Sequence, residues 1–165
     1  MKSHFQIAGH PIHVMTVGVP IGLYTGAFVA DAVYVLAHDA FWFRMAFWCI
    51  ALGLLGNLGA VLTGLPDFFA IKKEVPPAWN AATTHLVIGL GLVLLYAINF
   101  ALHNWGDPLA GGDSILPFIL SLVGAGLLGL QGWYGGELVF RHKVGVEETA
   151  AGGLHEAHQK RKGAS

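Results

Sequence analysis

The chain has 165 residues, of which 55% are hydrophobic and only 12% carry a charged side chain. Soluble domains average about 25% charged residues, and the mean hydropathy of this chain is +0.59, so the composition indicates a protein whose solvent is lipid. The net charge of −1 excludes the basic surface expected of a nucleic-acid-binding protein. Cys49 is the single cysteine, which excludes an internal disulfide and a thiolate metal cluster.

The N-terminal segment has one lysine followed by polar and histidine residues, and no small-residue cleavage site follows the first apolar run. This pattern favours an uncleaved membrane anchor over a signal peptide. A helix needs about 20 apolar residues to cross the hydrocarbon core of a bilayer. Stretches of this length predict four transmembrane helices, at about residues 14–37, 41–64, 82–102 and 115–140.

Three connections separate the predicted helices. The first, HDAF, is so short that the helices beside it are expected to form an antiparallel hairpin. The second, PDFFAIKKEVPPAWN, has prolines expected to stop helices and mixes aromatic residues with lysines, as an interfacial loop does. The third, HNWGDPLAGGDS, is a cluster of turn residues. The sequence therefore predicts an all-α integral membrane four-helix bundle over residues 1–146, followed by a polar, flexible tail over residues 147–165.

The basic residues predict the orientation of the bundle. One side of the predicted topology holds only Arg44, and the other holds eight basic residues: Lys2, Lys72, Lys73, Arg141, Lys143, Lys160, Arg161 and Lys162. Cytoplasmic loops carry an excess of Lys and Arg. Both termini are therefore expected on the cytoplasmic side of a bacterial-type inner membrane, which the chain crosses several times.

Small residues recur at four-residue spacing in the first two predicted helices. The first helix carries Gly18, Gly22, Gly26 and Ala30, and the second carries Gly56, Ala60 and Gly64. Rows of small residues let membrane helices approach closely, so both rows predict helix–helix contacts, either within the chain or between copies of it. Asn57 and Asn99 also lie in predicted spans, where interhelical hydrogen bonds are expected.

Six ionisable side chains fall at the cytoplasmic level, at the ends of the predicted helices: His10, His13, Asp67, His85, Glu137 and His142. Such groups are costly at this depth and mark functional sites in membrane proteins. Pro11 suits a first helical turn, which puts His10 and His13 on one helix face because they are three residues apart. Pro20 predicts a kink near Thr16 that would open this end of the bundle.

Some of these ionisable residues also have simple structural interpretations. Glu137 and Arg141 are four residues apart and predict an ion pair on one helix face. Asp67 is as well placed to cap a short segment after the second helix. Asp31, near the far end of the first helix, is expected to pair with Arg44 at the start of the second.

The chain resembles a family of bacterial membrane proteins known as domain of unknown function 2231. The matching motifs are GHPIHVMTVGVPIG with Asp31 in the same span, LTGLPDF, His85 at the start of the third helix, and GGELVFRHKVGV at the end of the fourth. Val14 and Lys143 depart from the residues that the family often has there, proline and glycine. The resemblance implies an integral four-helix domain, and because some relatives are fused to a Rieske-type iron–sulfur domain it also implies electron transfer.

One interpretation of the histidines is a site for b-type haem. Haem in a helical bundle takes two imidazoles from different helices, on opposite sides of the iron. His10 and His13 share one helix face, so each would need a partner from another helix. The candidate cofactor-binding residues are therefore His10, His13, His85 and His142.

A transition metal without haem is a variant of this interpretation. His10 and His13 would then be neighbouring ligands, completed by His85 and by a carboxylate of Asp67 or Glu137. In both variants the protein would contact the lipid bilayer and a redox partner protein, and the metal would serve electron transfer.

The other interpretation is a cofactor-free membrane subunit, with a role in transport or in an oligomeric structure. The histidines would then form a polar network or a pH-responsive site. The sequence has no nucleophile–base pair, phosphate-binding loop or HExxH motif that would indicate a hydrolytic enzyme. It leaves open whether the protein is an enzyme at all, and whether it self-associates.

Overall fold

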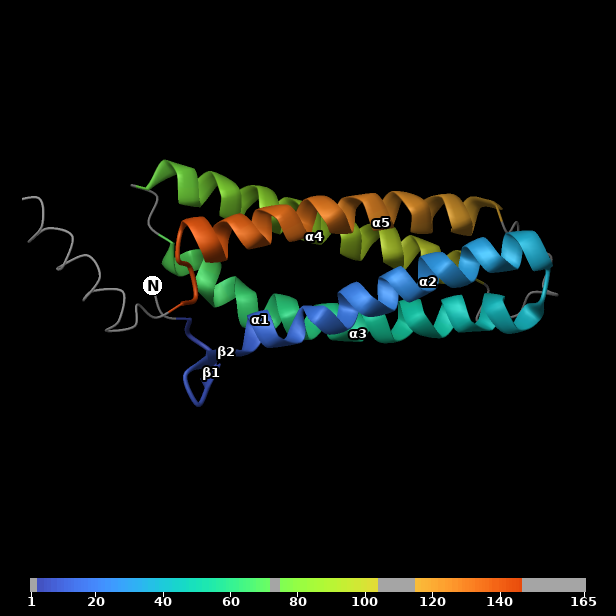
Figure 1. The fold of residues 1–165 in the computed structure, drawn as a ribbon, viewed down its shortest axis with the longest axis horizontal. Helices are drawn as coiled ribbons and strands as arrows, with labels where there is room; N and C mark the ends of the chain where they lie inside the picture. Colours follow the sequence, from blue (N-terminus) through green and yellow to red (C-terminus); the bar gives the residue numbers. More distant parts are fainter. Residues whose placement is uncertain (1–2, 72–74, 104–114, 147–165) are drawn as a thin grey trace, which may run out of the picture.

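The structure is a computed structural model that describes residues 3–71, 75–103 and 115–146 (Figure 1). Its elements are β1 (Gln6–Ile7), β2 (His10–Pro11), α1 (Ile12–Thr16), α2 (Gly18–Ala37), α3 (Ala40–Ala70), α4 (Pro76–Leu102), α5 (Ile115–Gly136) and the π-helix η2 (Glu137–Arg141). Four helical segments of 26 to 31 residues are long and apolar enough to cross a membrane. The prediction of an all-α membrane bundle is thereby confirmed. Residues 104–114 of the third connection and the predicted tail lie outside the described residues, and the orientation stays a prediction.

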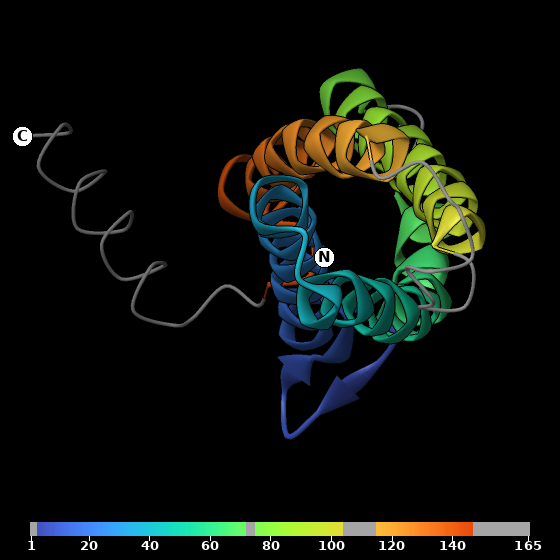
Figure 2. The same cartoon turned by 90° about the vertical axis from the view of Figure 1, so that its right-hand side faces the viewer.

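The helices form two antiparallel hairpins that pack side by side. The first hairpin comprises α1, α2 and α3, and the second comprises α4, α5 and η2. Across the two hairpins, α2 packs on α5 and α3 packs on α4, which closes the ring of helices seen end-on in Figure 2. Large apolar side chains such as Trp133 and Phe140 remain exposed on the outside, where lipid would cover them.

A compact core joins the hairpins midway along the bundle. Its buried side chains come from both hairpins: Tyr24, Ala27, Ile50, Leu92 and Tyr96. The rings of Tyr24 and Tyr96 are stacked, with centroids 3.7 Å apart and planes 2° from parallel. Gly53 makes room for this stack, since a methyl group there would lie 2.6 Å from the ring of Tyr24. The two hairpins therefore fit closely at this level.

The first transmembrane segment is interrupted at Val17, between α1 and α2. Pro20 has no backbone N–H to donate to the carbonyl of Thr16, four residues earlier. The break between α1 and α2 thus lies next to Thr16, while the predicted kink and the opening of this end of the bundle stay predictions.

The ends of α3 and α4 differ from the prediction, because prolines that were expected to stop helices do not. Pro66 lies inside α3, which continues to Ala70. Pro76 and Pro77 open α4 instead of preceding it by several residues. Proline is tolerated in a first helical turn because the N–H groups there have no partner within the helix.

Asp67 consequently lies within α3 and does not cap a separate segment. Its carboxylate accepts hydrogen bonds from the hydroxyl of Ser3, at 2.6 Å, and from the backbone N–H of His4, at 2.7 Å. The side chain thereby ties the N-terminal residues that precede β1 to the end of α3. The expectation that Asp67 caps a separate segment is wrong, because α3 does not end at Pro66 but continues to Ala70.

The two rows of small residues behave differently. A methyl group on Gly18 or Gly22 would meet no atom within 4 Å, whereas one on Gly26 would lie 3.5 Å from Cys49 on α3, and Ala30 is fully buried. Within the described part of this chain, only the second half of the first row therefore forms the predicted helix–helix contact. In the second row, a methyl group on Gly56 would lie 3.3 Å from Pro20, and Ala60 is buried. The second row therefore forms a close helix–helix contact inside the chain, as predicted.

Candidate functional site

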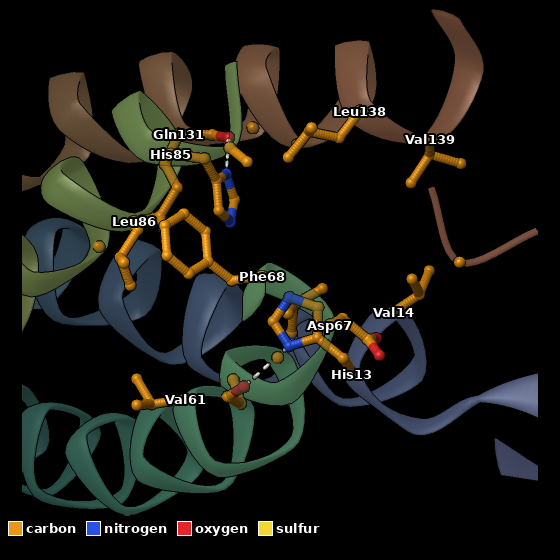
Figure 3. Close-up of a pocket in the computed structure, with 18 of the residues that line it drawn as sticks. His13, Val14, Val61, Asp67, Phe68, His85, Leu86, Gln131, Leu138 and Val139 are labelled. Carbon is orange, nitrogen blue, oxygen red and sulfur yellow. Dashed lines mark hydrogen bonds between the residues drawn. The ribbon is translucent and has the colours of Figure 1, made fainter. Parts of the chain in front are cut away.

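A cavity of about 400 Å³ lies between the two hairpins, near the end where α1 begins. Its volume is typical of sites for small molecules, which enclose about 300 to 1,000 Å³. Apolar side chains and glycines form most of its wall, among them Val61, Phe68, Leu86, Gly89, Gly132, Gly136, Leu138 and Val139 (Figure 3). Two histidines, His13 from the first hairpin and His85 from the second, interrupt this apolar lining.

The imidazole of His13 is fixed by the neighbouring helix α3. Its Nδ1 lies 2.8 Å from the backbone carbonyl oxygen of Ala60. A carbonyl can only accept a hydrogen bond, so Nδ1 carries the proton and Nε2 of the neutral ring keeps a free lone pair. The ring lies against Gly64, where a methyl group would come within 2.7 Å of it.

The imidazole of His85 is fixed in the same way by α5. Its Nδ1 lies 3.0 Å from the carbonyl oxygen of Gln131, so this ring also donates from Nδ1 and keeps its lone pair on Nε2. A methyl group on Gly135 would lie 3.1 Å from the ring. A half-buried histidine thus packs on the adjacent helix in each hairpin.

The two arrangements share one local design, which we call the carbonyl–glycine pair: Ala60 with Gly64, and Gln131 with Gly135. In an α-helix the carbonyl of a residue already accepts the N–H of the residue four positions later. A side chain at that later position would cover the carbonyl, whereas glycine leaves it open to a second donor. This explains why each imidazole contacts a glycine four residues after the residue whose carbonyl accepts its hydrogen bond.

Figure 3 shows the two rings on opposite sides of the cavity, with the nitrogen that is not bonded to a carbonyl turned inward in each case. The cavity therefore presents two Nε2 lone pairs from different hairpins within an apolar wall. Such a pair is able to coordinate one metal centre from two sides or to accept hydrogen bonds from a ligand.

The other two predicted cofactor-binding histidines do not line this cavity. His10 lies in β2, is exposed, and its Nδ1 is 3.0 Å from the carbonyl of Ala8 in the same turn. Pro11 has extended backbone angles and caps α1, so His10 is outside the helix and does not share a face with His13. His142 caps the end of η2, with its Nε2 3.9 Å from a carboxylate oxygen of Glu137.

Glu137 forms the predicted ion pair with Arg141, at 3.1 Å on an exposed helix face. Asp67 borders the cavity, but its carboxylate is occupied by the N-terminal residues described above. Within residues 3–71, 75–103 and 115–146, no three His, Cys, Asp or Glu side chains lie close enough together to hold a metal ion. The predicted metal site of His10, His13 and His85 with Asp67 or Glu137 is therefore not assembled.

A second polar cluster, which the sequence did not reveal as a unit, lies at the opposite end of the bundle. We call it the Asp31 network; its members are Asp31 on α2, Asn99 and His103 at the end of α4, and Ser121 on α5. The expected partner of Asp31 was Arg44, which is wrong: Arg44 is exposed on α3, and Asp31 instead binds His103 at 2.9 Å. The predicted interhelical role of Asn99 is confirmed by its bonds to α5.

Sequence comparison adds one finding to this geometry. No curated protein and no solved structure matches the chain. A family model described as a predicted membrane protein (DUF2231) matches residues 9–148, a range that includes both carbonyl–glycine pairs and the Asp31 network. The chain therefore belongs to the DUF2231 family of predicted membrane proteins.

Proposed function

We propose that this protein binds a b-type haem between His13 and His85 and transfers electrons within a bacterial-type inner membrane. The observation that carries the proposal is the matched state of the two imidazoles. Each donates its Nδ1 proton to a helix carbonyl and turns Nε2 into the same cavity, from a different hairpin. Histidines that ligate metals nearly always donate their other ring nitrogen in this way, because the bond fixes the tautomer and the ring orientation.

Haem suits this site better than a bare metal ion. A bare ion needs three or more protein ligands, and the described residues offer no such group. In haem the porphyrin supplies four ligands, so two opposed imidazoles are sufficient. The apolar wall and the open space beside Gly132, where a methyl group would meet no atom within 4 Å, favour a flat, apolar macrocycle as the ligand.

The protein residues would hold and orient the cofactor. The two carbonyl–glycine pairs fix the rings of His13 and His85, and apolar side chains such as Leu86 and Leu138 line the cavity between them. Haem supplies an iron that gains and loses one electron. If His13 and His85 both held the haem iron, no coordination position would remain for a substrate, which would favour electron transfer over oxygen or substrate chemistry.

The orientation of the site follows from the basic residues. The topology predicted from the sequence assigns eight of the nine Lys and Arg residues to the side of the membrane from which α1 starts, and the cavity lies near that end of the bundle. The cavity would then lie near the cytoplasmic surface, within reach of a redox partner protein on that side.

Titration of the purified protein with hemin, in detergent, tests the proposal. We expect one hemin per chain and the absorption spectrum of iron with two imidazole ligands. His13→Ala and His85→Ala should each abolish that spectrum. His10→Ala and His142→Ala serve as matched controls and should leave it unchanged, because neither side chain lines the cavity.

Two results would contradict the proposal. One is hemin binding that survives both His13→Ala and His85→Ala. The other is a colourless protein, from cells supplied with haem, that takes up no hemin. The second result would favour a cofactor-free membrane subunit in which the two imidazoles serve only to bind the carbonyls of α3 and α5.

A further inference from the structure

The Asp31 network lies far from the cavity, at the end of the bundle where α2 and α4 finish (Figure 1). Its four side chains are at most 2% exposed. They join three helices, α2, α4 and α5, that belong to both hairpins. The network therefore lies in the dry interior, where each polar atom depends on its hydrogen-bond partner.

The hydrogen bonds of His103 determine how many protons the network holds. Nδ1 lies 2.9 Å from the backbone carbonyl of Asn99, which only accepts, so Nδ1 carries a proton. Nε2 lies 2.9 Å from a carboxylate oxygen of Asp31. Without a further proton, Nε2 of His103 and the carboxylate oxygen of Asp31 would face each other with lone pairs alone and would repel. A hydrogen bond between them needs one proton on one of the two atoms. The pair of Asp31 and His103 must therefore hold one proton more than a neutral imidazole and an ionised carboxylate would hold separately.

The remaining bonds place this extra proton on the imidazole. Asn99 donates its amide N–H groups to the carbonyl of Pro117, at 3.3 Å, and to the hydroxyl of Ser121, at 2.8 Å. Ser121 is thereby left to donate its own proton to the second oxygen of Asp31, at 2.5 Å. A carboxylate that receives a donor on each oxygen is stabilised in its ionised form.

Within the part of the chain that the structure describes, the cationic partner of Asp31 is His103. Two further titratable groups near Asp31, Cys49 from α3 and Tyr96 from α4, are not able to carry a positive charge. Phe43 covers the ring of His103, with the ring centroids 4.8 Å apart. Among the described residues, the proton on His103 is therefore the charge that balances Asp31.

We propose that Asp31 and His103 form a proton-binding site, in which one proton is held as an imidazolium–carboxylate pair inside the membrane domain. Uncharged hydrogen bonds would join the same helices without the desolvation cost of two ions, so a buried ion pair is weak evidence for a purely stabilising role. Ionisable residues inside membrane domains typically serve proton or ion movement. The site is independent of haem binding, because it shares no residue with the cavity wall.

Nitrogen-15 NMR of histidine-labelled protein at pH 7.5, combined with infrared spectroscopy, tests the proton count. The His103 signals are assigned by their loss in His103→Gln. We expect both ring nitrogens of His103 to be protonated. In Asp31→Asn, which keeps the shape of the side chain and offers an N–H to the ring, Nε2 should lose its proton. Asp39→Asn is the matched control, because Asp39 is exposed at the same end of the bundle and should not affect His103.

Each outcome decides for or against the proposal. An unprotonated Nε2 together with a carboxylic acid band that disappears in Asp31→Asn would overturn the imidazolium–carboxylate form, because the proton would then lie on Asp31. An unprotonated Nε2 without such a band, or an unprotonated Nδ1, would show that the extra proton is absent and would overturn the proposal. Asp31→Asn that leaves the His103 nitrogens unchanged would overturn it as well.

Discussion

Gly64→Ala is expected to displace His13 from its hydrogen bond to Ala60. The added methyl group would lie 2.7 Å from the imidazole, closer than carbon and nitrogen atoms approach. The ring must move, which leaves Nδ1 without its acceptor at a cost of about 1–3 kcal/mol, and crowding adds about 1–3 kcal/mol. Alanine recovers only about 0.5–1 kcal/mol through its higher helix propensity, so the free energy of unfolding should fall by roughly 2 kcal/mol or more.

Gly59→Ala provides the control on the same helix. Gly59 is exposed, and a methyl group there would meet no atom within 4 Å. Thermal unfolding in detergent, followed by circular dichroism, should show a lower midpoint for Gly64→Ala and an unchanged or slightly higher midpoint for Gly59→Ala. Gly135→Ala should lie between them, because its methyl group would stand 3.1 Å from His85. If Gly64→Ala is as stable as Gly59→Ala and still binds hemin, the role assigned to the carbonyl–glycine pair is refuted.

Two further predictions concern the Asp31 network and the orientation. Ser121→Ala removes one of the two donors to a buried carboxylate and should lower the free energy of unfolding by about 1–3 kcal/mol. Thr25→Ala, which removes an exposed hydroxyl bonded within its own helix, should leave the unfolding midpoint in detergent nearly unchanged; equal effects would contradict the assignment. In a Cys49→Ala background, Ile7→Cys should resist an impermeant thiol reagent in intact cells and Ala37→Cys should react with it. The reverse pattern would invert the proposed topology.

Hydropathy alone was sufficient to predict the four helices, because length and apolar composition decide which segments cross a bilayer. It did not predict where α3 ends or where α4 begins. The sequence pattern predicts helix breaks at both Pro66 and Pro76, but the effect of proline depends on its position within a helix. The presence of a proline in the sequence does not show whether it lies inside a helix, as Pro66 does, or in a first helical turn, as Pro76 does.

The candidate site was predicted in part for a related reason. His13 and His85 follow from topology, because both fall at one level of the bundle. The rotation of each helix about its own axis cannot be predicted from topology. Membrane helices are apolar on nearly every side, so the sequence contains little sign of which side faces a neighbouring helix. This explains why Asp31 was assigned to Arg44, close in sequence, when its partner His103 is 72 residues away.

The location of the two carbonyl–glycine pairs has a consequence for how the protein is assembled. Each pair and its histidine belong to a single hairpin, so each hairpin is able to insert into the membrane and fix its own imidazole before it meets the other. A ligand bound to both rings would join the hairpins in the last step of assembly. Free ligand at 100 times its dissociation constant adds about 2.7 kcal/mol to the stability of a folded state that alone binds it. The cellular supply of such a ligand would then set how much of the chain persists as a closed bundle.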